Sequence, residues 1–175
     1  MADKINISTC CHYTMINNKI KIYLSARVSK DAQNWNDLVS NSLKRPISVF
    51  MPQKHTPRGD KHETFPVEIY QLCVNAIKES DMCLALPPYG RDCAWEIGWY
   101  ANSDKPLIIF VEKEIEWLRD WMIKGGADYI VTNNLQTYEI LKEDIILKNK
   151  SVIFIEDIEQ LGPVLIKIYN KHYKN

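Results

Sequence analysis

Residues Glu79 to Val111 read ESDMCLALPPYGRDCAWEIGWYANSDKPLIIFV, and this stretch decides the fold. Met82 to Leu86 is a short apolar run closed by two prolines, which is typical of a parallel strand covered on both faces. Cys93 to Ser103 is predicted to be a helix, with Asp92 at its N-cap position. Lys105 to Val111 is a second apolar strand. Strand, turn, helix and strand in this order predict one unit of a parallel α/β sheet.

The rest of the chain repeats this alternation of strands and helices. Other strands are expected at Lys19 to Ser25, Ile47 to Phe50 and Tyr129 to Val131, and Ser151 to Ile155 is compatible with a short extra strand. Helices are expected at Asp31 to Leu43, Pro66 to Ser80, Ile115 to Lys124, Leu135 to Leu147 and Glu156 to Tyr173, the last interrupted near Gly162-Pro163. This alternation predicts an α/β fold with a doubly wound parallel sheet, flavodoxin-like order 2-1-3-4-5, and helices on both faces.

Length and charge restrict the class of ligand. The chain has 175 residues, enough for one substantial core, and we expect a single domain over residues 19–175. Its 22 basic residues equal its 22 acidic residues, so no long-range field favours a nucleic-acid polymer or an anionic membrane. No apolar run reaches the length of a bilayer span, and we expect a cytoplasmic protein that binds a small molecule.

The cysteines indicate reduced thiols and no metal. Five cysteines form an odd count without the paired spacing of zinc sites. Cys10-Cys11-His12 lacks a second group of ligands, so no metal is expected there, and no cofactor is expected elsewhere. Residues 1–18 are expected to be a poorly ordered tail.

Chemistry-bearing residues gather where strands of the predicted sheet end. The turn Tyr89-Gly90-Arg91 leads into a helix whose first turn holds Glu96, and ligands of open α/β sheets bind at such strand ends. After the first strand, the loop with Ser25, Arg27 and Ser29 is either an anion cradle or a solvated turn. Asn133, after the fifth strand, lies on the same sheet edge. Because the first and third strands are neighbours in the expected order, both loops should face one crevice.

Residues Asp92 to Trp99, DCAWEIGW, carry a resemblance to a known family. An acidic residue, a small residue, an aromatic, Glu, an aliphatic, Gly and an aromatic resemble the signature of the nucleoside 2-deoxyribosyltransferases and of the related nucleoside 5'-monophosphate N-glycosidases. The likeness continues at Lys19 to Ala26 and at Trp121 to Thr132. It implies a nucleoside or nucleotide ligand and a homo-oligomer.

The resemblance also implies roles for single residues. It makes Glu96 the nucleophile and puts Tyr23 beside the sugar, where the alternative is a tyrosine of the core. In the monophosphate-cleaving branch, Ser and Arg residues of the first loop hold the 5'-phosphate. The family usually carries Asp or Asn for the sugar where this chain has Cys73, which is a much weaker hydrogen-bonding group.

The expected reaction is cleavage of an N-glycosidic bond. Glu96 would capture the anomeric carbon, and another base or water would then take the sugar. Asp92, one helical turn away, is the candidate acid for the departing base, with plain N-capping as the alternative. Tyr89 is the expected stacking partner of the base, whereas Trp95 and Trp99 are expected in the core or at a subunit contact.

Two other functions stay open at this point. A TIR-like domain that cleaves NAD shares the alternating layout and a Glu after a Trp-containing turn. A non-catalytic nucleotide sensor would keep the pocket but lack sugar recognition, and Cys73 is compatible with that reading.

Overall fold

A six-stranded parallel sheet forms the centre of the molecule, with strand order β2-β1-β3-β4-β5-β6. The computed structural model describes residues 19–56, 65–112 and 120–174. The strands are β1 (Ile20–Ala26), β2 (Ile47–Phe50), β3 (Met82–Leu86), β4 (Leu107–Val111), β5 (Tyr129–Thr132) and β6 (Ser151–Phe154). The predicted doubly wound order is confirmed, and β6 adds a parallel strand beside β5.

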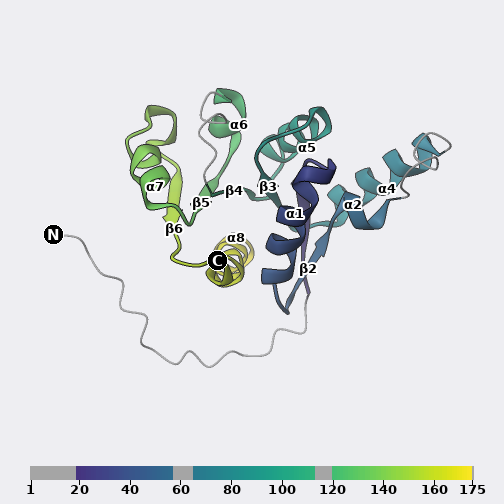
Figure 1. Cartoon of the computed structure of the whole chain (residues 1–175), viewed down its shortest axis with the longest axis horizontal. Helices are drawn as coiled ribbons and strands as arrows, with labels where there is room; N and C mark the ends of the chain where they lie inside the picture. Colours follow the sequence, from purple (N-terminus) through teal and green to yellow (C-terminus); the bar gives the residue numbers. More distant parts are fainter. Residues whose placement is uncertain (1–18, 57–64, 113–119, 175) are drawn as a thin grey trace.

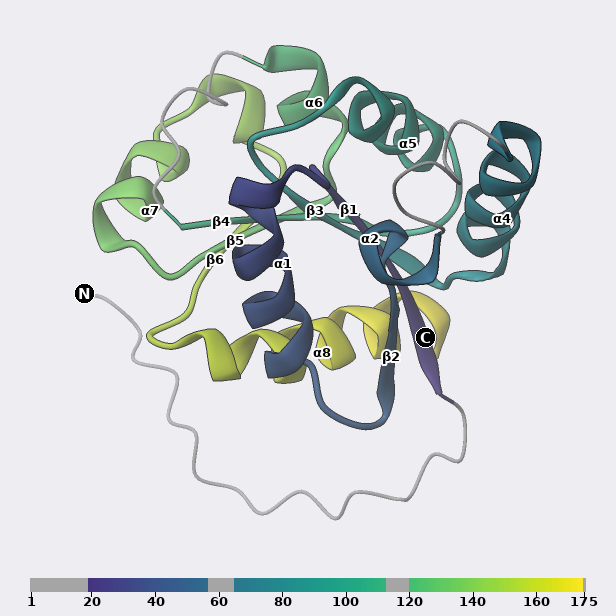
Figure 2. The same cartoon turned by 45° about the vertical axis from the view of Figure 1, so that its right-hand side comes forward.

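Helices cover both faces of the sheet (Figures 1 and 2). They are α1 (Lys30–Ser42), α2 (Pro52–His55), α4 (Pro66–Glu79), α5 (Arg91–Ala101), α6 (Trp121–Gly126), α7 (Leu135–Lys142) and α8 (Leu161–Tyr173), with short 3-10 turns η2 (Ile145–Leu147) and η3 (Ile158–Gln160). Helices α1 and α8 bury side chains in one core cluster, and α4, α5 and α7 contribute to the other. Two hydrophobic cores therefore sandwich the sheet.

The alternation of side chains along β1 assigns its residues to opposite faces. Ile22 and Leu24 belong to the core under α1 and α8, whereas Tyr23 belongs to the core under α5. In the β1–β3 pairing, Tyr23 lies beside Cys83 and Ser25 beside Ala85. Because a strand has a period of two residues, Tyr23 and Ser25 share the face toward α5. The small side chains of β3 leave room there for a residue of that helix.

Several helix ends differ from the sequence prediction. The N-cap of α5 is Gly90, so the expectation that Asp92 caps this helix is wrong, and Asp92 lies within the first turn. Helix α8 begins at Leu161 without an interruption, because Pro163 falls in the first turn, where its missing N–H costs nothing. Helix α6 continues through Gly126, where a Cβ would lie 2.9 Å from the Cβ of Ala101. That glycine serves close helix packing.

Some expectations fall outside the described part of the chain. The tail at residues 1–18 lies there, as does the beginning of the helix expected at Ile115 to Lys124. In the described segments, no helix combines the length and apolar character needed to cross a bilayer.

Candidate functional site

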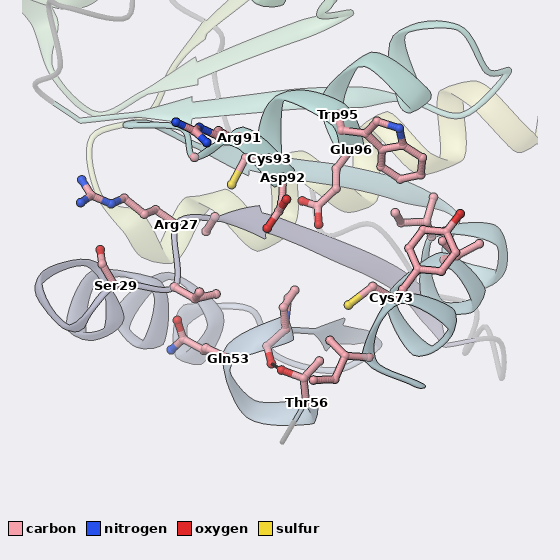
Figure 3. A pocket seen from close by; sticks show the side chains of 18 of the residues that line it. Arg27, Ser29, Gln53, Thr56, Cys73, Arg91, Asp92, Cys93, Trp95 and Glu96 are labelled. Atoms are coloured by element: carbon pink, nitrogen blue, oxygen red, sulfur yellow. Dashed lines mark hydrogen bonds between the residues drawn. The ribbon is translucent and has the colours of Figure 1, made fainter. Parts of the chain in front are cut away.

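A cavity of about 760 Å³ opens at the carboxyl ends of β1 and β3, bordered by the β1–α1 loop, α2, α4 and α5. Figure 3 shows its side chains. The predicted site residues among those that line it are Arg27, Ser29, Cys73, Gly90, Arg91, Asp92 and Glu96. The loops after the first and third strands therefore do face one cavity, as the strand order predicts.

The Glu96 side chain lies at this cavity and is held by β1. Its Oε1 accepts a hydrogen bond from the Tyr23 hydroxyl at 2.5 Å, and its Oε2 accepts one from the Ser25 hydroxyl at 2.7 Å. Glu96 is only 8% exposed, and both donors are fully buried. Each carboxylate oxygen has about two acceptor sites, so each keeps one for a ligand. The carboxylate is thus oriented by the sheet while it still borders the cavity.

The environment of Glu96 changes its acidity. Burial raises the pKa of Glu96, the hydrogen bonds from Ser25 and Tyr23 lower it in part, and the Asp92 carboxylate raises it further. The net pKa lies above the ordinary value for a glutamic acid. Burial, followed by the proximity of Glu96, also raises the pKa of Tyr23 far above its ordinary value, so Tyr23 remains a neutral donor.

Aromatic contacts keep Tyr23 in position. Its ring stacks on Phe50 of β2 with centroids 5.5 Å apart, and Phe50 stacks in turn on His55 at 4.8 Å. The ring of Tyr100 from α5 lies 6.3 Å away on a tilted plane. The tyrosine is therefore both a core residue and the partner of Glu96, so the two readings of Tyr23 do not exclude each other.

One end of the cavity is suited to an anion. Arg27 and Arg91 are exposed there. The N-cap residues of α1 and α5, Ser29 and Gly90, lie there as well, and neither forms a side-chain capping hydrogen bond. Guanidinium groups and free N–H groups at helix N-termini both bind anions. Ser25 is not part of this end: it belongs to β1, and its hydroxyl donates to Glu96. The expectation that Ser25 contributes to an anion-binding loop is therefore wrong.

Asp92 lines the cavity on the same side of α5 as Glu96. It is exposed, whereas Glu96 is buried. In Figure 3 both carboxylates point into the cavity. Their spacing of four residues is one helical turn, which brings the two groups close together.

Two thiols complete the wall near Glu96. Cys73 of α4 and Cys93 of α5 both line the cavity. Burial raises the pKa of each thiol, and the Glu96 carboxylate raises it further, so both remain neutral. A neutral thiol at Cys73 offers a sugar hydroxyl only a weak hydrogen bond.

Two predicted ligand residues lie elsewhere. Tyr89 does not line the cavity and packs against the core under α5, with its hydroxyl buried. Asn133 follows β5 and is likewise not among the lining residues. The turn after β3 presents Gly90 and Arg91 to the cavity instead.

Other lining residues were not predicted. They include Gln53 and Thr56 near α2, Ile69, Tyr70 and Val74 of α4, and Trp95 of α5. Trp95 was expected in the core or at a subunit contact, but its side chain is 52% exposed, so the core placement is wrong. The sequence signal for the α4 residues is an apolar stripe at Val67, Tyr70, Val74 and Ile77, and such a stripe looks the same whether it faces a core or a cavity.

The described residues contain no group of three or more His, Cys, Asp or Glu side chains placed to hold a metal ion. The site offers a carboxylate held by two hydrogen bonds, a second carboxylate nearby, and an end lined by two arginines. These groups suit chemistry at a carbon that develops positive charge.

The family of the chain follows from its similarity to a known family model. Residues 19–115 match the model of the family described as nucleoside 2-deoxyribosyltransferase like. A solved structure of a 2-deoxyribosyltransferase from Bacillus psychrosaccharolyticus is 24% identical, with a TM-score of 0.48 over 63% of this chain and 84% of that one. No curated protein matches the chain. The family match spans more than half of the sequence and includes every described residue that lines the cavity. The chain belongs to the nucleoside 2-deoxyribosyltransferase-like family.

Proposed function

We propose that the protein cleaves the N-glycosidic bond of a nucleoside or nucleoside 5'-monophosphate, with Glu96 as the nucleophile, and passes the sugar to another base or to water. The observation that carries this proposal is the buried Glu96 carboxylate, bound once at each oxygen by β1 and bordering the cavity. Family membership supports glycosyl transfer as the reaction class.

The proposed step begins when a Glu96 oxygen forms a bond to C1' of the sugar. The bond from C1' to the base nitrogen breaks, and its electron pair goes to the base, which takes up a proton. Asp92 is the proposed donor, because it lines the same cavity one turn away. A second base or a water molecule then attacks C1' and releases the carboxylate.

Tyr23 and Ser25 are positioning residues in this scheme. Their hydrogen bonds favour the ionised carboxylate against the effect of burial. They also fix which oxygen lone pairs remain for the sugar, so the nucleophile needs no reorientation during the reaction.

The anion-binding end favours the monophosphate over the free nucleoside. A 5'-phosphate at Arg27 and Arg91 would place the sugar toward Glu96, since Asp92 and Glu96 follow Arg91 on the same helix. The Ser29 hydroxyl and the first-turn N–H groups of α1 and α5 would add donors.

The direct test is product release from a panel of ribo- and deoxyribonucleosides, their 5'-monophosphates and NAD, each with and without a free acceptor base. We expect base release from the nucleosides or monophosphates, abolished in Glu96→Gln and retained in Glu143→Gln, which changes an exposed glutamate outside the cavity. Release of nicotinamide alone would favour the NAD-cleaving reading. Nucleotide binding without any product would favour a sensor.

A further inference from the structure

We propose that Trp95 and Tyr70 form the surface on which the base of the substrate stacks, at the α4 side of the cavity. This inference rests on the proposed cleavage at Glu96 and adds a position for the base. The two aromatic side chains come from α5 and α4, and both line the cavity.

The cavity separates charged from apolar side chains. Arg27, Ser29 and Arg91 stand at one end, and Trp95 stands at the other, with Asp92 and Glu96 between them (Figure 3). A nucleotide carries its 5'-phosphate arm on C4' and its base on C1', at opposite ends of the sugar ring. With the sugar at Glu96 and the phosphate at the arginines, the base must lie toward Trp95.

Both aromatic rings are open to a ligand. Trp95 is 52% exposed and Tyr70 is 60% exposed, and both border the cavity. Among the described residues, neither ring contacts another aromatic ring. Trp99 shows the contrast on the same helix, because it lies edge-on to Tyr100 at 5.2 Å and packs against the core. Rings that border a pocket and are not stacked on another aromatic ring of the described residues are suited to a flat ligand.

The α4 wall supports the same assignment. Tyr70, Val74 and Ile77 of its apolar stripe line the cavity, together with the neighbouring Ile69. Ile77 is buried, but Tyr70 remains open to the cavity, so part of this stripe lacks a protein surface to cover it. A base bound there would shield this apolar area from water.

The position of Trp95 relative to Glu96 is fixed by their helix. Glu96 attacks C1' on the face opposite the departing base, so the base lies across C1' from the carboxylate within the same cavity. Trp95 precedes Glu96 on α5 and projects from a different side of the helix, and both residues line that cavity. Stacking is tolerant of base identity because every base has a flat π-face. We therefore expect both purine and pyrimidine nucleotides to bind, with the larger purine ring more dependent on Trp95.

The test measures binding by calorimetry in a Glu96→Gln background, which prevents turnover. The ligands are 2'-deoxyadenosine 5'-monophosphate and base-free 2-deoxyribose 5-phosphate. Trp95→Ala should weaken nucleotide binding about 5- to 100-fold. It should leave the base-free sugar phosphate within about twofold, the size of an ordinary surface substitution. Trp95→Phe should restore most of the nucleotide affinity, and Tyr70→Ala should repeat the base-dependent loss.

Trp121→Ala is the matched control, because Trp121 is 68% exposed and does not line the cavity. Unchanged nucleotide affinity in Trp95→Ala would overturn the stacking surface and leave the proposed cleavage intact. Equal losses for the nucleotide and the sugar phosphate would also overturn it. If Glu96→Gln with an intact cavity binds no nucleotide at all, the proposed function fails as well.

Discussion

At the scale of single residues, the site depends on how three polar side chains share one buried location. Glu96 is a carboxylate in a poorly solvated position, and its pKa is raised by burial. Two neutral hydroxyl donors offset part of that effect without adding charge. Such a carboxylate is less strongly solvated than one in water, which leaves it more reactive toward a cationic carbon.

Tyr23→Phe should move the acid limb of the rate profile to higher pH. The Tyr23 hydrogen bond favours ionised Glu96, so its removal raises the pKa of Glu96 and lowers the ionised fraction on the acid side. Loss of a hydrogen bond to a charged group should raise the pKa of Glu96 enough that kcat/KM on the acid side of the profile falls about tenfold or more. The measurement is kcat/KM against pH. Tyr138→Phe, on α7 outside the cavity, should leave the profile unchanged; an unmoved acid limb in Tyr23→Phe would argue against the role.

Asp92→Asn tests whether this carboxyl supplies the proton. If it does, kcat should fall about 100-fold or more for ordinary bases, the usual contribution of a general acid. The loss should largely vanish for a nucleotide of 7-methylguanine, because that base already carries a positive charge and departs without a proton. A loss of equal size for both substrates would assign Asp92 to binding instead.

Sequence reasoning at this scale found the polar residues better than the aromatic ones. Glu96, Asp92 and Arg91 follow the end of a strand, and that position alone brings them to the cavity. Ser25 was placed in the loop because the end of β1 cannot be read to one residue from sequence. Tyr89 was expected at the ligand but packs against the core, whereas Trp95 was expected in the core or at a subunit contact but lines the cavity. Both side chains are amphipathic, so their sequence positions do not distinguish a core from a pocket.

At the scale of elements, α4 is a wall of the cavity that is fixed to the body of the protein at its C-terminal end. The ammonium group of Lys105 donates to the backbone carbonyls of Ile77 at 3.2 Å, Lys78 at 2.6 Å and Ser80 at 2.5 Å. These carbonyls end the helix, where a cation also interacts favourably with the helix dipole.

Lys105→Met should therefore lower the free energy of unfolding by about 1–2 kcal/mol through the loss of these hydrogen bonds and of the dipole interaction. Urea denaturation measures the change. Lys148→Met, which alters an exposed lysine beyond η2, is the control and should stay within about 0.5 kcal/mol. A stability equal to that of the control would show that water replaces the ammonium at the helix end.

The elements themselves were largely predictable, because the apolar runs of β3 and β4 and the alternation with helices are strong signals. The sequence does not predict which surface the apolar face of a helix packs against. The α4 stripe has the spacing of a core-facing helix, yet Val67 is 71% exposed and Tyr70 faces the cavity. Periodicity indicates that a face is apolar and does not identify its partner.

At the scale of the whole molecule, the buried Glu96 carboxylate lowers the free energy of unfolding when it is ionised. Because burial raises the pKa of Glu96 in the folded state, the folded protein binds a proton more tightly there than the unfolded chain does. The stability linked to this proton is fully present below the ordinary glutamate pKa. It is lost as the pH rises through the raised value in the folded protein.

Glu96→Gln should therefore raise the melting temperature at neutral pH, with a gain that shrinks as the pH falls toward the ordinary glutamate value, where wild-type Glu96 is protonated in both states. Differential scanning calorimetry between pH 4 and 8 gives the comparison. Glu143→Gln controls for loss of an exposed carboxylate. A pH-independent difference between the two variants would contradict the linkage.

The arrangement of β1 has a consequence for how this protein can diversify. Tyr23 and Ser25 reach Glu96 only because they occupy alternate positions of one strand, 73 and 71 residues away from it along the chain. Inserting or deleting one residue before Tyr23 would rotate both hydroxyls to the opposite side of the sheet. New substrate preferences in descendants of this gene should thus arise by exchange of wall residues, while the length of that strand stays constant.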